Sequence, residues 1–152
     1  MNLTIIFIFD TITNGFRGDI MDFLGYSLVK IDAKGRVIIP AKFRKKIEGK
    51  TLILSKVNVI GKNVIAVFPT YECARDVLGS YFDFSEQNFD RNISLLMGEY
   101  TMDSANRISI GKLLDDREEK EMVAVGKRDD FELWYRSDLE DYCREENLQL
   151  YL

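Results

Sequence analysis

Short apolar runs separated by polar segments occur along most of the chain, a pattern typical of a mixed α+β domain. Short segments with the β-branched and aromatic composition of strands predict strands at residues 26–31, 37–39, 51–56, 64–68, 99–102, 108–110, 121–125 and 131–135. Apolar residues at helical spacing predict helices over residues 71–82 and 89–97 and a final helix that carries Leu139 on one face. A short basic helix is expected over residues 41–47, and a loop over residues 58–63. Ser137 followed by Glu140 predicts a capping box at the start of the final helix.

One segment occurs twice. Residues 32–40 (DAKGRVIIP) and 103–111 (DSANRISIG) share Asp, two spacers, Gly or Asn, Arg, a β-branched residue, a spacer and Ile, and lie 71 positions apart. The strands that follow each copy also match in order. The repeat therefore predicts two related halves that are joined by helices.

The repeated motif has a local physical logic. Gly35 and Asn106 occupy the same position, and these two residue types most readily adopt a positive φ. Asp32 and Asp103 precede them, and an Asp at the start of a turn can accept hydrogen bonds from the backbone that follows. We therefore expect each copy to form a hairpin braced by its Asp. The alternative is a plain hairpin with solvated charges.

Composition excludes several classes of chemistry. A chain of 152 residues forms one domain or two very small ones, and this chain has no histidine and only two cysteines, which are far apart. Histidine-based catalysis and most zinc sites are therefore excluded, and we expect no enzymatic activity and no cofactor. The longest apolar run, residues 3–9, is too short to span a membrane. A reduced, cytoplasmic setting without membrane attachment is the expectation.

Charge is distributed unevenly along the chain. The net charge is −4, yet residues 30–47 contain seven basic residues and one acidic residue. Such a basic patch on an acidic body can attract a polyanion locally. The alternative is a solvated helix face without a ligand. The basic residues that we single out beside the first motif are Lys34, Lys42, Arg44, Lys45 and Lys46.

The residues that carry a family resemblance lie around both copies of the motif. Residues 23–27 (FLGYS) and 31–44 (IDAKGRVIIPAKFR), and in the second copy residues 97–99, 103–107 and 131–134, resemble MraZ proteins. The resemblance implies an α+β fold of two tandem AbrB-like swapped-hairpin halves, which form a small interlocked β-barrel-like core with flanking helices. It divides the chain into a first half (21–82), a linking helix (83–96) and a second half (97–152).

The same resemblance implies a function and its partner. MraZ proteins are DNA-binding transcriptional regulators of the division and cell-wall gene cluster. They bind short guanine-rich direct repeats upstream of their own operon and form ring-shaped homo-oligomers, so a nucleoid-associated protein is implied. We expect Arg36 and Arg107 to read guanine, Lys34 to assist, and the other four basic residues to hold phosphates. Gly111 replaces the proline of the first copy and few basic residues follow it, so the first motif should contribute more.

Residues 1–20 have no counterpart in either half. We expect that translation starts at Met21 and that these residues are not part of the native protein. The alternative is an additional edge strand from Thr4 to Phe9.

Two other functions compete with the regulator. An AbrB-type antitoxin or transition-state regulator carries its DNA-binding hairpin once per chain, and the tandem copy speaks against it. A ring-forming interaction scaffold that binds no DNA would suit the acidic net charge. Binding to a guanine-rich duplex separates these functions.

Overall fold

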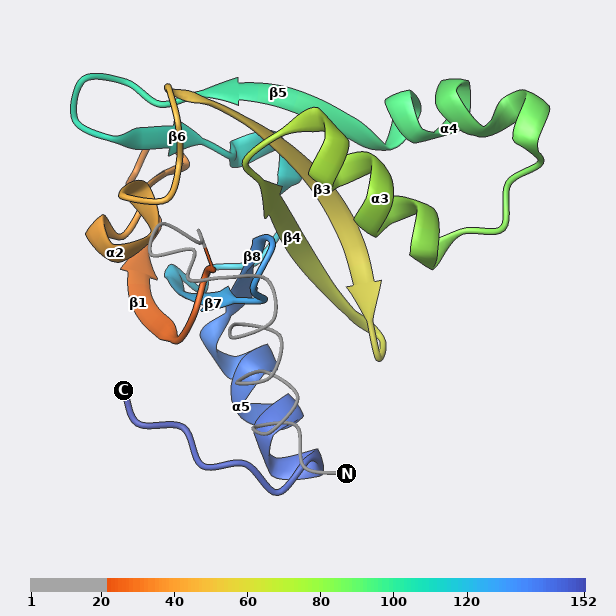
Figure 1. Ribbon diagram of the computed structural model, residues 1–152. Coiled ribbons are helices and arrows are strands. Elements are labelled where there is room, and N and C mark those ends of the chain that lie inside the picture. The colour runs from red at the N-terminus through yellow and green to blue at the C-terminus, as the bar shows by residue number, and fades with distance from the viewer. Residues whose placement is uncertain (1–21) are drawn as a thin grey trace, which may run out of the picture.

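A computed structural model describes residues 22–152, and its centre is one antiparallel six-stranded sheet (Figure 1). The strand order is β1-β7-β8-β4-β3-β5. The bounds are β1 Tyr26–Lys30, β3 Thr51–Val59, β4 Lys62–Phe68, β5 Met97–Thr101, β7 Glu121–Gly126 and β8 Phe131–Tyr135. The predicted α+β class is confirmed. The predicted barrel-like core is wrong in one respect: β1 and β5 form opposite edges, so this sheet is not closed. The predicted strand at residues 4–9 and the predicted start at Met21 lie outside the described residues.

Strands that are far apart in the sequence pair with each other across the two copies of the repeat. β1 of the first half pairs with β7 of the second, and β5 of the second half pairs with β3 of the first. β2 (Arg36–Ile38) and β6 (Arg107–Ser109) form a separate two-stranded ribbon, named here the β2–β6 ribbon. In this ribbon Val37 lies opposite Ile108, its equivalent in the repeat, so the ribbon is symmetric about that pair. The boundaries at 21–82, 83–96 and 97–152 stay a prediction.

The predicted hairpin forms its turn but not its ladder. The backbone N–H of Asp32 donates to the carbonyl of Arg36 at 2.8 Å, which closes the turn. Beyond the turn the arms separate, because β1 joins β7 in the large sheet and β2 joins β6 in the ribbon. Each arm therefore finds its partner strand in the other half of the chain.

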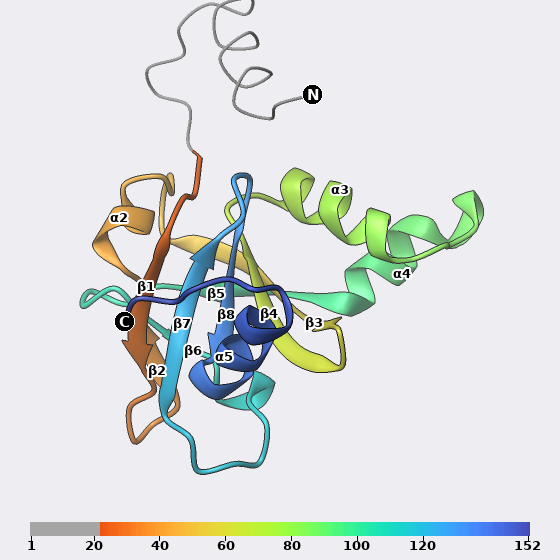
Figure 2. The same cartoon turned by 90° about the horizontal axis from the view of Figure 1, so that it is seen from below.

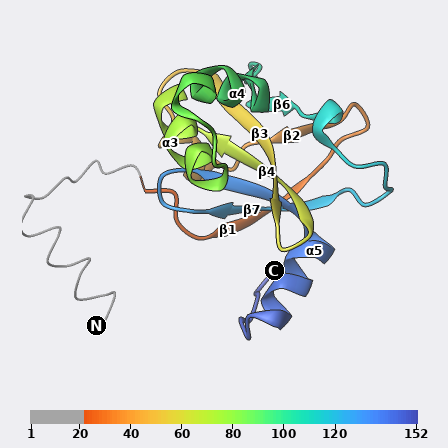
Figure 3. The same cartoon turned by 90° about the vertical axis from the view of Figure 1, so that its right-hand side faces the viewer.

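α2 (Ala41–Arg44) and the β2–β6 ribbon pack into one hydrophobic core of the sheet, and the other α-helices pack into a second core. The first core includes Val37, Phe43 and Ile108. The second core holds residues of α3, α4 and α5. The bounds are α3 Tyr71–Tyr81, η1 Glu86–Asn88, α4 Phe89–Leu96, η2 Gly111–Leu113 and α5 Arg136–Glu145. α3 and α4 extend to the side away from α2 (Figure 2), and α5 projects away from them (Figure 3). Among residues 22–152 no helix combines the length and apolarity that crossing a bilayer requires.

Two local predictions are wrong in the extent of an element. The expected loop at 58–63 is a tight turn, since Ile60 and Gly61 adopt φ of 49° and 80° and the Asn58 side chain accepts from the Gly61 N–H at 3.0 Å. β3 therefore continues to Val59. The predicted basic helix over 41–47 is also shorter, because α2 ends at Arg44.

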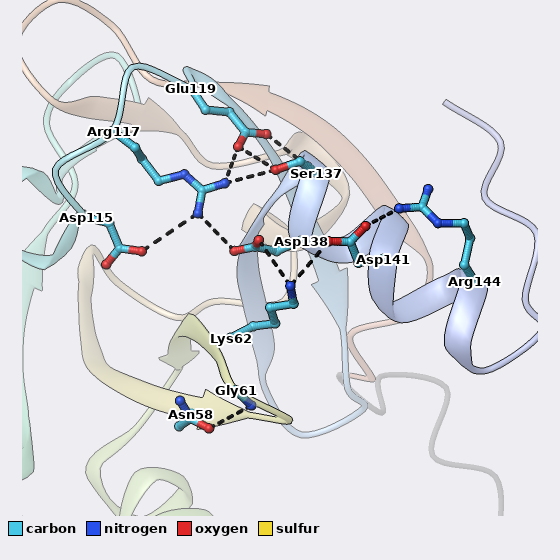
Figure 4. Close-up of polar contacts among 10 residues, drawn as sticks. All are labelled: Asn58, Gly61, Lys62, Asp115, Arg117, Glu119, Ser137, Asp138, Asp141 and Arg144. Atoms are coloured by element: carbon cyan, nitrogen blue, oxygen red, sulfur yellow. Dashed lines mark hydrogen bonds and ion pairs between the residues drawn. The ribbon is translucent and has the colours of Figure 1, made fainter.

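The predicted capping box is absent from α5. The Ser137 hydroxyl and backbone N–H instead bind Glu119 at 2.6 and 2.9 Å, within an ion-pair network shown in Figure 4. Arg117 in this network donates to Asp138 at 3.2 Å and lies 3.8 Å from the centroid of the Tyr135 ring. The network holds the segment before β7 against the start of α5.

Candidate nucleic-acid interface

The first turn (residues 32–36) is organised by a single carboxylate. Oδ1 of Asp32 accepts hydrogen bonds from the backbone N–H groups of Lys34 and Arg36, both at 2.9 Å. Its Oδ2 accepts from Nε of Arg36 at 2.8 Å. The backbone bond to Arg36 is the main reason that the pKa of Asp32 lies below its ordinary value. The carboxylate thus fixes both the turn and the direction of the arginine.

The second turn (residues 103–107) repeats this arrangement bond for bond. Oδ1 of Asp103 accepts from the N–H groups of Ala105 and Arg107, both at 2.9 Å, and Oδ2 accepts from Nε of Arg107 at 2.8 Å. Bonding to the Arg107 backbone again lowers the pKa of Asp103. Both aspartates therefore bond to the backbone of their own turn and to the arginine that follows it.

The position shared by Gly35 and Asn106 is left-handed in both turns, as its composition predicts. The φ values are 76° and 63°. The surroundings differ, because a Cβ placed on Gly35 would lie 3.0 Å from Cα of Gly111. The first turn therefore has a steric requirement for glycine in addition to its backbone conformation.

Both arginines present the same edge of the guanidinium. Each Nε is occupied by its aspartate, while within residues 22–152 neither Nη of Arg36 or Arg107 has a hydrogen bond to the protein. Their side chains are 23% and 34% exposed. A planar pair of Nη donors with a fixed Nε matches an acceptor pair such as guanine O6 and N7.

The β2–β6 ribbon places these arginines on one face. Arg36 lies opposite Ser109, and Arg107 lies opposite Ile38. Because side chains alternate along a strand, these four residues point outward, whereas Val37 and Ile108 are buried at 1% exposure. The arginines are diagonal neighbours, a position that in such a ladder separates two residues by roughly 7–8 Å and their Cβ atoms by somewhat less. The structure therefore brings the two predicted base readers together.

Lys34, predicted to assist at the tip, and the four residues predicted to hold phosphates differ in exposure and in their contacts. Lys34 lies exposed at the tip of the first turn, and Lys45 is exposed just beyond α2. Lys42 donates to the carbonyl of Tyr26 at 2.7 Å, and Arg44 donates to the carbonyl of Ile39 at 2.6 Å. Lys46 is half-buried after α2. Lys34, Lys42 and Lys45 are thus the exposed members of the five, and Lys42 and Arg44 also support the backbone around α2.

One basic residue beside the ribbon, Lys112, was not among the site residues predicted from the sequence. Lys112 lines a hollow of about 490 Å³ together with Lys34 and Ser109. Its Nζ lies 5.2 Å from the centroid of the Tyr100 ring. A signal was present in the repeat, because Lys112 directly follows the second motif, but its proximity to Lys34 depends on the pairing of β2 with β6.

A buried carboxylate lies in the β7–β8 turn, apart from the ribbon. Asp130 is 2% exposed, and its Oδ2 has no hydrogen-bond partner in the described part of the chain. Burial raises its pKa to about 7. Among residues 22–152 no group of His, Cys, Asp and Glu is placed to hold a metal ion.

Comparison with known proteins gives one consistent answer. Residues 23–72 match the family model described as "MraZ protein, putative antitoxin-like". A protein of Corynebacterium jeikeium is 32% identical over 130 residues, which cover 81% of this chain and 87% of the relative. A Moorella thermoacetica protein is 33% identical over 129 residues, with the same two coverages, and one from Shewanella frigidimarina is 32% identical over 123 residues, covering 76% and 80%. All three bear the name "Transcriptional regulator MraZ". With this identity over most of its length, and with both Asp–Arg turns in place, the chain belongs to the MraZ family.

Proposed function

We propose that this protein is a sequence-specific DNA-binding transcriptional regulator whose β2–β6 ribbon reads guanine in the major groove. The name shared by its relatives supports a role in transcription regulation. The observation that carries the proposal is the pair of arginines on one ribbon face, each with Nε held by an aspartate and both Nη groups open. The major groove admits a two-stranded ribbon, and an arginine fork on guanine N7 and O6 contributes about 1–3 kcal/mol of discrimination.

Positioning on the duplex falls to the surrounding lysines. Lys34 and Lys45 meet phosphates, which fix the register without specifying sequence. Asp32 and Asp103 do not face the DNA, because each is turned toward its own turn and arginine. The aspartates therefore act as positioning residues.

The regulator acts as a homo-oligomeric ring on short guanine-rich direct repeats upstream of its own operon, in the division and cell-wall gene cluster. One chain offers few phosphate contacts and has a net charge of −4, so its separate affinity is modest and falls steeply with salt. Many identical ribbons on a repeated sequence raise the affinity through effective concentration. The protein works in the cytoplasm, associated with the nucleoid.

The test compares two labelled duplexes of equal length, one with several guanine-rich repeats and one with A·T pairs at those guanines. We expect the wild-type protein to prefer the first duplex in fluorescence anisotropy at low and moderate salt. The Arg36→Ala/Arg107→Ala variant should lose the preference and keep only weak, salt-sensitive binding. Arg91→Ala, which removes one positive charge from α4, is the matched control and should bind as wild type. A preference that survives in the double variant would contradict the proposal.

The same preparation separates the competing functions. An interaction scaffold shows no preference between the duplexes at either salt concentration. An antitoxin copurifies with a small toxin when it is expressed together with its neighbouring gene. Removal of that toxin then changes the DNA-binding curve.

A further inference from the structure

We propose that Ile38 is a specificity-determining residue that packs against the C5 methyl group of a thymine next to the guanine read by Arg107. The inference rests on the proposed function and deepens it, because it names a second base and the side chain that selects it.

The exposure of Ile38 stands out within its own strand. Ile38 is 54% exposed, whereas Val37 and Ile39 on either side are 1% and 0% exposed. A single exposed isoleucine is common on protein surfaces and has no meaning by itself. This isoleucine, however, lies on the face that carries Arg36 and directly opposite Arg107. Its side chain would therefore meet whatever those arginines bind.

The spacing of the ribbon suits two adjacent bases. Side chains directly opposite each other in an antiparallel pair have Cβ atoms about 4.5–5.5 Å apart. Successive bases along a DNA strand rise by about 3.4 Å. When Arg107 reaches a guanine, Ile38 consequently faces the same base pair or its neighbour. Thymine is the standard base that presents an apolar group in the major groove, so it is the base that an aliphatic side chain selects.

The repeat shows that this apolar contact belongs to one end of the ribbon. The residue equivalent to Ile38 is Ser109, which lies opposite Arg36. Beside Ile38 a hollow of about 300 Å³ is lined by Leu28, Pro40 and Ala41, with Lys30 and Arg44 also in its lining. The equivalent residues beside Ser109 are Glu99, Gly111 and Lys112, which line the polar hollow of about 490 Å³.

This asymmetry gives the ribbon a direction on DNA. A symmetric ribbon would bind equally well in both orientations along the groove. With Ile38 at one end and Ser109 at the other, the orientation that places the thymine methyl group beside Ile38 is favoured. A directional reader suits direct repeats rather than palindromes.

The experiment begins with selection of bound duplexes from a pool with a randomised central region, using the wild-type protein. Each thymine of the selected duplex is then replaced singly by deoxyuridine, which removes only the methyl group. We expect one position next to a guanine where wild-type affinity falls about fourfold, the effect of uncovering one methyl-sized group. A second comparison places either cytosine or 5-methylcytosine, paired with guanine, at that position. The 5-methylcytosine duplex should bind more tightly than the cytosine duplex, because it alone carries the methyl group.

Two exchange variants test the residue itself. Ile38→Ser should bind the thymine and deoxyuridine duplexes equally, and Ile38→Ser/Ser109→Ile should move the methyl sensitivity to the other end of the site. Both changes lie on the exposed ribbon face, and circular dichroism reports folding. If wild type prefers guanine-rich DNA but no thymine responds to loss of its methyl group, Ile38 is not a reader, while the proposed function stands. If Ile38→Ser retains the methyl sensitivity, or changes only the oligomeric state, the inference is also overturned. Absence of any sequence preference in wild type would overturn both proposals.

Discussion

Asp32 and Asp103 hold their arginines in the same way, through two backbone bonds of 2.9 Å and one bond of 2.8 Å to Nε. What surrounds the two turns is different. Gly35 lies in close contact with the backbone of Gly111. The first turn is followed by a basic segment, whereas after the second turn Asp116 occupies the position equivalent to Lys45. The comparison teaches that the Asp–Arg turn is a self-contained unit. Its bonds are local, so the unit tolerates divergence around it.

Removing each arginine separately is the strongest way to break this comparison. Arg36→Ala and Arg107→Ala should each weaken binding to guanine-rich DNA by about 5- to 150-fold per contact, the cost of one bidentate base contact. The loss should be larger for Arg36, because the basic residues near it make its end of the ribbon contribute more. Titration by anisotropy measures both. Equal losses would mean that the surroundings of the turns do not affect DNA binding.

The β-turns that join the long strands give a second contrast between the halves. The β3–β4 turn satisfies its own polar groups through Asn58, whereas the β7–β8 turn buries Asp130 with its pKa raised from 3.8 to about 7. Between these pH values the folded state binds more protons than the unfolded state, so stability falls as pH rises from about 4 to about 7 and then levels off. Between pH 5 and 8 the free energy of unfolding of the wild-type protein should fall by roughly 2 kcal/mol because of Asp130, and the Asp130→Asn variant should lack this fall.

Urea denaturation at both pH values measures the effect of Asp130. The control is Asp129→Asn, which removes the adjacent carboxylate; unlike Asp130, Asp129 is exposed. A wild-type and an Asp130→Asn protein with parallel pH profiles would show that the buried carboxyl group does not titrate in this range.

Exchanging the left-handed residues sharpens the comparison of the turns themselves. Gly35→Asn should lower the free energy of unfolding by about 1–2 kcal/mol, because its Cβ would lie 3.0 Å from the Gly111 backbone at a φ of 76°. Asn106→Gly should change it by less than about 0.5 kcal/mol, since the backbone conformation suits either residue. Thermal and urea unfolding measure both variants. Equal destabilisation of the two variants would contradict the claim that only the first turn requires glycine for steric reasons.

The smallest expected effect concerns phosphate contacts. Lys45→Ala should weaken binding to the guanine-rich and the A·T duplex by the same factor and reduce the slope of log K against log salt by about 0.9. The equivalent residue Asp116 offers the control, because Asp116→Ala lies in the half that lacks the basic segment. A loss of sequence preference in Lys45→Ala would assign it a base contact instead.

The placement of the strands was predictable, but their partners were not. Runs of consecutive apolar residues mark β3, β4, β7 and β8 in the sequence, because each strand buries side chains on both faces of the sheet. Nothing local to β1 indicates that it pairs with β7, about a hundred residues away, rather than with its neighbour β2. The open form of the sheet follows from those distant pairings and was therefore also missed.

In the candidate site too, contacts between residues close in sequence were predictable, and contacts that depend on the pairing of distant strands were not. The bonds of Asp32 to Arg36 span four residues, so the repeat alone indicates them. The outward position of Ile38 and the proximity of Lys112 to Lys34 depend on the pairing of β2 with β6. Ser137 illustrates the opposite error, because its partner Glu119 lies 18 residues away and the local capping pattern was misleading.

Direct contact between the ribbon arginines and guanine N7 is the central claim, and 7-deazaguanine tests it most directly because it removes N7 while keeping base pairing. Affinities are compared for duplexes with guanine or 7-deazaguanine at each guanine of the selected site, using the wild-type, Arg36→Ala and Arg107→Ala proteins. We predict that wild type loses about 5-fold or more at two guanines, and that each arginine variant becomes insensitive at one of them. Wild-type affinity that is unchanged by 7-deazaguanine at every position would contradict the account.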